Sequence, residues 1–325
     1  MTISDDGKTV GLFEPLMVSE NSPARAGLND LVLELAEKSA AFRSGLPASV
    51  SDALADLVRA MNCYYSNLIE GHDTHPIDIE RAMRNDYSAD PSRRNLQLEA
   101  KAHVAVQKWV DEDGMSEPAT APSSIVDLHR RFCELLPPEL LFVQNPKTGE
   151  QIPVVPGELR TRYVEVGRHV AISPGAVPRF LERMDKAYSL PGRIEAILAA
   201  ACAHHRLLWV HPFLDGNGRV ARLMSYAMLR KALDTRGLWS VARGLARQPA
   251  IILTDFTSLR EGASTLFIDA TEIVLNISDV GLKIRTYQFG VSSHVVLGLG
   301  QERSLGRNTI RRRSYWLASK QDRQQ

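Results

Sequence analysis

The chain has 325 residues, of which 44% are hydrophobic and 24% charged, values that suit a globular protein with one large domain or two modest ones. Its formal net charge of +1 predicts neither a nucleic acid nor a membrane surface as a partner. The three cysteines, Cys63, Cys133 and Cys202, are widely spaced and odd in number, which favours free thiols in a reducing compartment over a disulfide framework.

No targeting signal or membrane span is predicted. Residues 1–11 are polar, which excludes a signal peptide. The longest apolar stretch, residues 194–210, is interrupted by Glu195, His204 and Arg206, as expected of a buried helix. We therefore expect a cytoplasmic protein.

In chain order, the pattern predicts a mainly α protein. Residues 1–24 are expected to form a flexible arm, and apolar residues then recur at helical spacing. The predicted helices cover 24–43, 47–70, 77–84, 95–110, 124–136, 177–188, 194–210 and 218–233, with a linker at 114–124 and Ser124 as an N-cap. Residues 154–175 alternate β-branched runs with glycines, which predicts a β-hairpin.

Beyond about residue 250 the helical pattern fades. Residues 251–325 form a divergent C-terminal region that is only weakly predicted, and we expect low order there. The arginine cluster at 311–313 favours a solvated basic tail over a nucleic-acid site.

The segment from His211 to Arg222 combines several groups that bind or transfer phosphate. Gly216 and Gly218 allow a tight turn just before a predicted helix, whose free N–H groups can bind an anion. Arg219 and Arg222 lie three residues apart on one helical face, where both can reach the same polyphosphate. Asp215 offers a hard oxygen ligand for Mg²⁺, and His211 can accept a proton near neutral pH.

Simpler interpretations account for less of this segment. Asp-Gly and Asn-Gly also favour hairpin turns, but the flanks here are helical. A calcium loop would need an oxygen ligand at Arg219 and a glutamate at Tyr226. A buried core histidine would explain His211 alone, but not the whole constellation.

The segment, His-Pro-Phe-Leu-Asp-Gly-Asn-Gly-Arg-Val-Ala-Arg, resembles the motif of the Fic family with every fixed position filled. The resemblance covers residues 25–250 and implies a Fic-type helical core at 124–250, preceded by an N-terminal helical region at 25–113. It implies AMP transfer from ATP to a Ser, Thr or Tyr hydroxyl of a target protein, with Mg²⁺ as the cofactor.

The same resemblance assigns roles to the residues of the motif. His211 would be the general base, Asp215 would hold Mg²⁺, and Phe213 would anchor the loop. The phosphates would be cradled by Gly216, Asn217 and Gly218 and gripped by Arg222, with Arg219 in support.

Ser66-Asn-Leu-Ile-Glu70-Gly71 resembles the inhibitory motif of the family, which implies that Glu70 pairs with Arg222 and blocks productive ATP binding. Ser66 and Glu70 lie four residues apart, hence on one helical face, and Gly71 can end the helix. Without the Fic motif downstream, a solvated glutamate near a helix end would be the simpler interpretation.

Other segments agree with the resemblance. Pro156-Gly-Glu-Leu-Arg160 resembles the start of the family's flap, so we expect the target protein to dock around residues 157–167 by strand addition. An ordinary surface hairpin is the alternative there. His204 is expected to be structural, and no metal-binding motif supports zinc at His204, His205 and His211.

Three functions remain open at this point. The first is protein adenylylation. The second is other chemistry on the same fold: removal of AMP, transfer of another nucleotide, or phosphate transfer. The third is an ATP-sensing or DNA-binding regulator with the C-terminal region as the reader. The identity of the target stays open, and so does a homodimer.

Overall fold

The structure is a computed structural model that describes residues 3–246, apart from positions 73, 146, 147, 168, 190, 191 and 235. Within this range the protein is mainly helical, as predicted, with two small antiparallel hairpins. The divergent C-terminal region expected at 251–325 lies outside the described residues.

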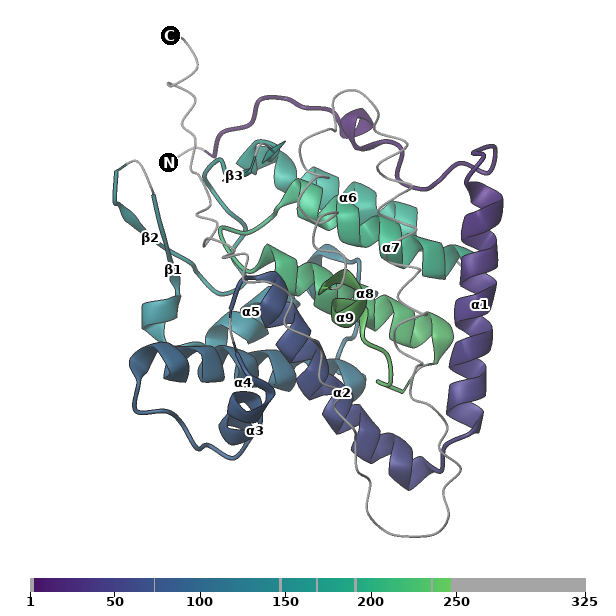
Figure 1. Cartoon of the computed structure of the whole chain (residues 1–325). Coiled ribbons are helices and arrows are strands. Elements are labelled where there is room, and N and C mark those ends of the chain that lie inside the picture. The colour runs from purple at the N-terminus through teal and green to yellow at the C-terminus, as the bar shows by residue number, and fades with distance from the viewer. Residues whose placement is uncertain are drawn as a thin grey trace.

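The helices follow one another with short connections in the N-terminal half and around the motif (Figure 1). Their bounds are α1 (Arg25–Ser44), α2 (Ala48–Ile69), α3 (Pro76–Met83), α4 (Pro91–Asp111), α5 (Pro122–Glu134), α6 (Val177–Tyr188), α7 (Arg193–Val210), α8 (Asn217–Leu233) and α9 (Val241–Ala246). Three short 3-10 turns cover Val10–Phe13, Pro138–Leu140 and Pro174–Ala176.

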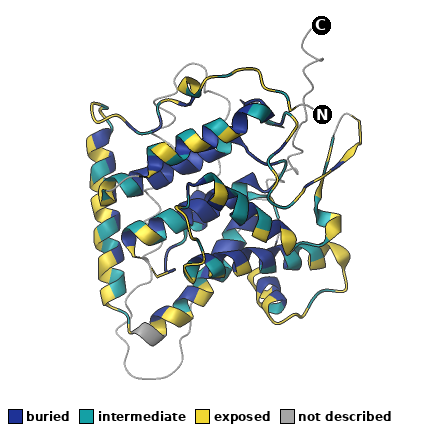
Figure 2. Ribbon diagram, turned by 180° about the vertical axis from the view of Figure 1, so that it is seen from behind, coloured by how far each residue is buried: buried dark blue, intermediate teal, exposed yellow. Residues whose placement is uncertain are grey.

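Helix α7 forms the centre of the core. All eleven residues of its segment 197–207 are buried, and seven of them are alanine, isoleucine or leucine. Helix α8 packs along α7, α6 covers a further face of α7, and α5 packs on α6 and α8, so buried residues gather on the inner sides of these helices (Figure 2). Residues of α1 and α4 belong to the same apolar cluster, so the N-terminal helices share one core with the motif helices.

Local sequence explains where several helices begin. Pro91 stands at the first position of α4, and the Asp90 side chain accepts a hydrogen bond from the backbone N–H of Ser92. This cap starts α4 four residues earlier than predicted. The predicted N-cap at Ser124 is wrong: α5 begins at Pro122, and the Ser124 hydroxyl donates to the Glu117 carbonyl instead.

The β structure differs from the single predicted hairpin. β1 (Phe142–Gln144) pairs with β2 (Gln151–Pro153) ahead of the predicted segment, and this hairpin projects from the helices in Figure 1. Within the predicted segment only β3 (Glu165–Val166) and β4 (His169–Val170) pair, with two residues each. Much of 154–164 is held by side chains instead of a ladder, above all by Arg160, as described below.

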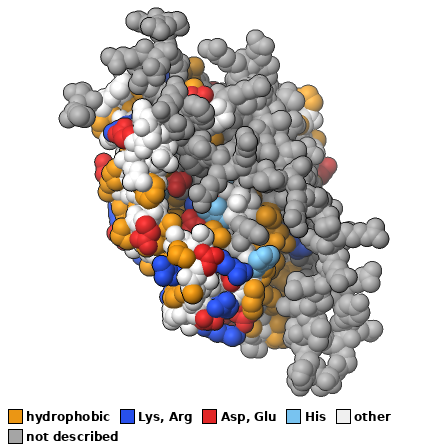
Figure 3. Space-filling view, turned by 60° about the vertical axis from the view of Figure 1, so that its left-hand side comes forward, with side chains coloured by type: hydrophobic (Ala, Val, Ile, Leu, Met, Phe, Trp, Pro, Cys, Tyr) orange, Lys and Arg blue, Asp and Glu red, His pale blue; other side chains and the backbone are white. Residues whose placement is uncertain are grey.

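None of the helices described here has the length and apolarity to cross a bilayer. On the face shown in Figure 3, acidic and basic side chains of the described residues lie interspersed with apolar ones.

The N-terminal segment packs on the helices, in contrast to the flexible arm that its composition predicted. Phe13, Leu16 and Val18 are buried in the main core, and the Phe13 ring lies 5.4 Å from the Trp209 ring on α7. The Tyr188 hydroxyl donates to the Leu16 carbonyl at 2.7 Å. These three apolar side chains form no helical or strand period, and Arg179 on α6 adds hydrogen bonds to Asp5 and to the Lys8 carbonyl.

Replacing Phe13 by alanine should lower the free energy of unfolding by about 3–5 kcal/mol, because it leaves a cavity beside α6 and α7. Urea denaturation measures this change. Leu12→Ala is the matched control, since Leu12 is 56% exposed and its loss should change stability by less than about 0.5 kcal/mol. Equal effects of the two substitutions would contradict the packing of this segment.

Candidate functional site

The motif forms the loop between α7 and α8. His211 ends α7 in a left-handed conformation with φ of +51°, which is uncommon for a residue with a side chain and typical of functional sites. Gly216 has φ of +78° and directly precedes α8, where glycine adopts this conformation without strain. These two turns direct the first N–H groups of α8 toward the loop.

Asn217 holds the loop in this shape. Its Oδ1 accepts from the Phe213 N–H at 2.9 Å, and its Nδ2 donates to the Phe213 carbonyl at 2.9 Å. Both bonds are fully buried, which makes their loss costly. The amide of Asn217 therefore shapes the loop from within, and only its backbone N–H remains suited to the phosphate contact expected from the sequence.

The structure places His211 at the end of α7, buried beside the loop. Its Nδ1 lies 3.3 Å from the Leu208 carbonyl, which puts the ring proton on Nδ1 and the basic lone pair on Nε2. Burial lowers the pKa of His211 to about 3, with the nearby charge of Arg160 acting in the same direction. The imidazole is therefore neutral at physiological pH, the state that a general base requires.

Asp215 is the candidate ligand for Mg²⁺. Burial raises the pKa of this carboxyl, and the charge of Arg219 and the N–H of Gly216 only partly oppose that change. A single carboxylate beside a phosphate-binding turn matches the way Mg²⁺ is usually held, with substrate oxygens and waters completing the shell. The residues present therefore fit the metal that the sequence predicted.

Arg222 lies on α8 and is bound by the end of α2. Its Nη2 contacts Glu70 Oε1 at 2.5 Å, and its Nε donates to the Ser66 hydroxyl at 2.9 Å. Burial alone would raise the pKa of Glu70, but the charges of Arg222 and Arg219 lower it to about 2. Gly71 follows with φ of +79°, a conformation that favours glycine just after the end of a helix.

The Glu70 carboxylate also occupies the N-terminus of α8. A Cβ built on Gly218 would overlap Glu70 Oε1, so the carboxylate lies directly against the backbone of the glycine turn. Carboxylates and phosphates compete for such positions, because both satisfy free N–H groups and the positive end of the helix dipole. The structure thus pairs Glu70 with Arg222, as the resemblance implies, and also places Ser66 and Gly218 against this pair.

Arg219 has a carboxylate partner that the sequence analysis missed. Glu99 on α4 accepts from Arg219 Nη2 at 3.0 Å, and the His72 ring lies 2.7 Å from the other Glu99 oxygen. Glu99 is buried, and the charge of Arg219 together with the His72 contact lowers its pKa against the opposing effect of burial. The sequence did contain a signal for this partner, because Glu99 is a charged residue on the apolar face of the predicted helix at 95–110.

Arg160 ties the flap to the motif loop. Its side chain is 2% exposed and donates to the carbonyls of His211 at 2.7 Å and Ile172 at 2.6 Å. Its backbone N–H donates to the Pro212 carbonyl at 2.9 Å. Burial lowers the pKa of this guanidinium to about 10, so it remains charged at neutral pH. The predicted Gly-x-x-Arg segment therefore binds the backbone of His211, the candidate base, and of the residue after it.

His204, expected to be structural, is buried and its Nδ1 lies 2.8 Å from the Ser225 hydroxyl on α8. Burial lowers its pKa to about 3, so the ring is neutral at physiological pH. This contact joins the facing sides of α7 and α8. It gives His204 a place in the packing of the two motif helices.

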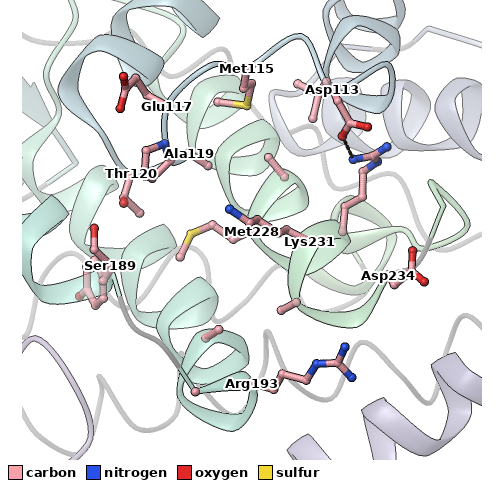
Figure 4. A pocket seen from close by; sticks show the side chains of 18 of the residues that line it. Asp113, Met115, Glu117, Ala119, Thr120, Ser189, Arg193, Met228, Lys231 and Asp234 are labelled. Carbon is pink, nitrogen blue, oxygen red and sulfur yellow. Dashed lines mark hydrogen bonds and ion pairs between the residues drawn. The ribbon is translucent and has the colours of Figure 1, made fainter.

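A cavity of about 750 Å³ lies away from the motif, between the segment after α4 and the facing ends of α7 and α8 (Figure 4). Met115, Thr120, Ser189 and Met228 are among the residues that line it. None of the predicted site residues lines this cavity, and its lining offers no convergent set of catalytic groups. We therefore place the functional site at the motif loop, because of the chemistry of its residues, and not at this cavity.

Comparison with known proteins identifies the fold and the motif. The sequence model of the Fic/DOC family matches residues 120–229. Protein adenylyltransferase Fic of Drosophila willistoni is 27% identical over 173 residues, 52% of this chain and 31% of that protein. Its counterpart in Drosophila ananassae is 25% identical over 235 residues, 68% of this chain and 44% of that protein. The chain thus spans less than half the length of these curated relatives.

Solved structures agree on the fold. A fragment of Fic-1 from C. elegans has a TM-score of 0.59 at 18% identity and covers 78% of this chain and 70% of its own. A Fic family protein from Desulfovibrio desulfuricans G20 has a TM-score of 0.58 at 14% identity, covering 81% and 75%. Together with the motif loop, these similarities define a helical Fic-type domain.

The protein is a Fic/DOC domain protein and a distant homologue of protein adenylyltransferase Fic.

The Glu70–Arg222 pair should stabilise the fold in a pH-dependent way. A carboxyl with a lowered pKa contributes stability above its unfolded value of about 4.5 and loses it as the pH falls toward the folded value of about 2. The difference in free energy of unfolding between wild type and Glu70→Gln should therefore be constant from pH 8 to 5 and shrink below about 4.5.

Urea denaturation at pH 7, 5, 4 and 3 measures this difference. Glu112→Gln provides the control, because Glu112 also caps a helix C-terminus but lies outside the motif site. A difference that stays unchanged down to pH 3 would show that the Glu70 carboxylate is not held by the arginines.

Proposed function

We propose that the protein is an adenylyltransferase that moves AMP from ATP to a Ser, Thr or Tyr hydroxyl of a target protein, and that Glu70 holds it inactive. The observation that carries this proposal is the Glu70 carboxylate seated on Gly218 and Arg222. It marks an anion-binding cradle of backbone and guanidinium groups in the loop that also presents His211.

The protein's own groups suffice for the proton transfer and for binding the phosphates. His211 Nε2 would take the proton of the target hydroxyl as its oxygen attacks the α-phosphorus. The new oxygen–phosphorus bond forms while the bond from the α-phosphorus to the bridging oxygen breaks, and pyrophosphate leaves. The N–H groups of Gly216 to Gly218 would bind the phosphates, and the charge of Arg222 would stabilise the γ-phosphate.

Mg²⁺ held by Asp215 would neutralise phosphate charge during transfer. Burial raises the pKa of Asp215, so this carboxyl becomes ionised at a higher pH than an exposed aspartate does. Metal binding should therefore improve as the pH rises and Asp215 loses its proton. Among the described residues no cluster of three histidine, cysteine or acidic side chains forms a separate metal site.

The inhibition by Glu70 follows from occupancy and charge. Arg222 already donates hydrogen bonds to Glu70 through Nη2 and to the Ser66 hydroxyl through Nε, so these two donors would not be available to a phosphate. The γ-phosphate would also meet a carboxylate of its own sign at Gly218. Since the pKa of Glu70 is about 2, a change of physiological pH cannot release it, and α2 itself must move.

The target protein would dock along the flap, residues 157–167. β3 pairs with β4 over two residues only, which leaves backbone groups of this segment for strand addition. Arg160 would then hold the docked segment at a fixed distance from the His211 backbone.

Removal of AMP is a second candidate function that one observation favours. The ionised Glu70 carboxylate lies within the site, where it could orient a water for attack on the phosphorus of an AMP-modified hydroxyl. In that case Glu70→Gly would abolish removal of AMP while it increases AMP addition.

Glu70→Gly should increase AMP transfer by more than tenfold, because it returns both the cradle and Arg222 to the nucleotide. The assay compares labelling of protein by α-³²P-ATP and γ-³²P-ATP with Mg²⁺ present. Label from the α-position alone identifies AMP transfer, whereas label from the γ-position alone identifies a kinase and contradicts the proposal.

Glu112→Gly is the matched control for this experiment, because it makes the same substitution at the C-cap of α4 and should leave labelling unchanged. Equal labelling by wild type and Glu70→Gly would remove the inhibitory role of Glu70.

His211→Ala in the Glu70→Gly background should lower transfer by at least about a hundredfold while ATP binding stays within about threefold, because the base takes part only in the chemical step. His211→Asn provides a second variant that tolerates the left-handed conformation. Isothermal titration with ATP and Mg²⁺ measures binding. Transfer that survives in both variants would require another base.

A further inference from the structure

His129 on α5 lies between the flap and the motif loop without belonging to either. Its side chain is fully buried, and its ring is parallel to the Phe213 ring, with 3.9 Å between centroids and 3° between planes. Phe213 is the motif residue whose backbone Asn217 clamps. The ring of His129 is thus stacked on the most tightly held point of the loop.

Hydrogen bonds determine how the ring is protonated. The Gly157 N–H donates to His129 Nδ1 at 3.0 Å. A backbone N–H can only donate, so Nδ1 carries the lone pair and the neutral ring carries its proton on Nε2. The Cys133 sulfur lies 3.4 Å from Nε2, and the edge of the ring faces Gly216, where a Cβ would lie 3.6 Å from Nε2. One imidazole therefore connects Gly157 to the motif loop at Phe213 and Gly216.

These two partners belong to the two parts of the site that must be aligned. Gly157 begins the flap, where the target would dock, and Phe213 and Gly216 flank the candidate metal ligand Asp215 on the loop. Arg160 already ties the flap to the His211 end of the loop. His129 ties the flap to the Gly216 end, so the flap contacts both ends of the loop.

The fit around the ring is close. A Cβ on Gly216 would lie 3.4 Å from His129 Cδ2, and a Cβ on Gly157 would lie 3.0 Å from Arg130. Both glycines also have φ near +77°, which favours glycine independently of space. At Gly157 a Cβ would press on Arg130, whereas at Gly216 the space would accept a Cβ and the positive φ is what favours glycine.

We propose that His129 is a positioning residue that sets the distance between the docked target hydroxyl and the nucleotide phosphates by joining Gly157 to the motif loop at Phe213 and Gly216. The inference rests on the transfer reaction proposed above, and His129 itself touches neither reactant. Small errors in such an alignment lower the rate of transfer far more than they lower nucleotide affinity.

Three variants in the full chain with Glu70→Gly separate the contacts of the ring. His129→Phe keeps the stacked ring and loses the hydrogen bond from Gly157. His129→Asn keeps an acceptor near the position of Nδ1, whereas His129→Gln places its amide near the position of Nε2. Arg131→Ala, at an exposed position two residues further along α5, is the matched control.

We expect His129→Phe to exchange the Gly157 amide hydrogen at least tenfold faster, as measured by hydrogen–deuterium exchange of the peptide around residue 157. Its affinity for ATP with Mg²⁺ should stay within threefold, while α-³²P labelling falls at least tenfold. His129→Asn should restore slow exchange at Gly157 and recover part of the labelling, whereas His129→Gln should resemble His129→Phe.

Unchanged exchange and labelling in His129→Phe would overturn the proposal. Exchange raised evenly across α5 in all three variants would also overturn it, because the ring would then only fill the core. If the Glu70→Gly parent transfers no α-label, the adenylyltransferase function fails by itself. The exchange measurements still decide then whether His129 couples flap and loop.

Discussion

The reciprocal hydrogen bonds between the Asn217 amide and the Phe213 backbone are the constraint on which the rest of the site depends. They close the loop after α7 and set the direction in which α8 begins. The left-handed turns at His211 and Gly216 persist because this buried closure compensates for the unfavourable conformation at His211. The candidate base, the candidate metal ligand and the glycine turn that could bind an anion consequently lie in one short segment with a well-defined conformation.

The N-terminal helices complete this site by charge. Glu70 from α2 neutralises Arg222, and Glu99 from α4 neutralises Arg219, so each arginine of the motif has a carboxylate from a different helix. These pairs are largely buried, where an uncompensated guanidinium would be costly. Helix α4, which carries Glu99, belongs to the apolar cluster that includes α1, α7 and α8, and α2 packs on α4 in a second cluster through Cys63, Ala100 and Val104.

The sequence predicted most helices closely, because long amphipathic segments such as 177–188 carry a strong periodic signal. The resemblance to the inhibitory motif also predicted that Glu70 pairs with Arg222. Glu99 and His129 escaped notice, because each is a single polar residue in an apolar pattern. Their partners, Arg219 and Gly157, lie 120 and 28 positions away, a separation that only the fold resolves. The start of α4 was missed because residues 91–94 are polar and exposed.

The paired arginines also affect how fast a polyanion can arrive. Under the proposed function, and with Asp215 ionised, Glu70, Glu99 and Asp215 would balance the formal charges of Arg160, Arg219 and Arg222, so the inhibited site would exert little long-range attraction on ATP. Withdrawal of α2 would remove one negative charge and leave the cradle net positive. Release of the helix would therefore accelerate nucleotide capture through electrostatic steering, in addition to vacating the space that the γ-phosphate requires.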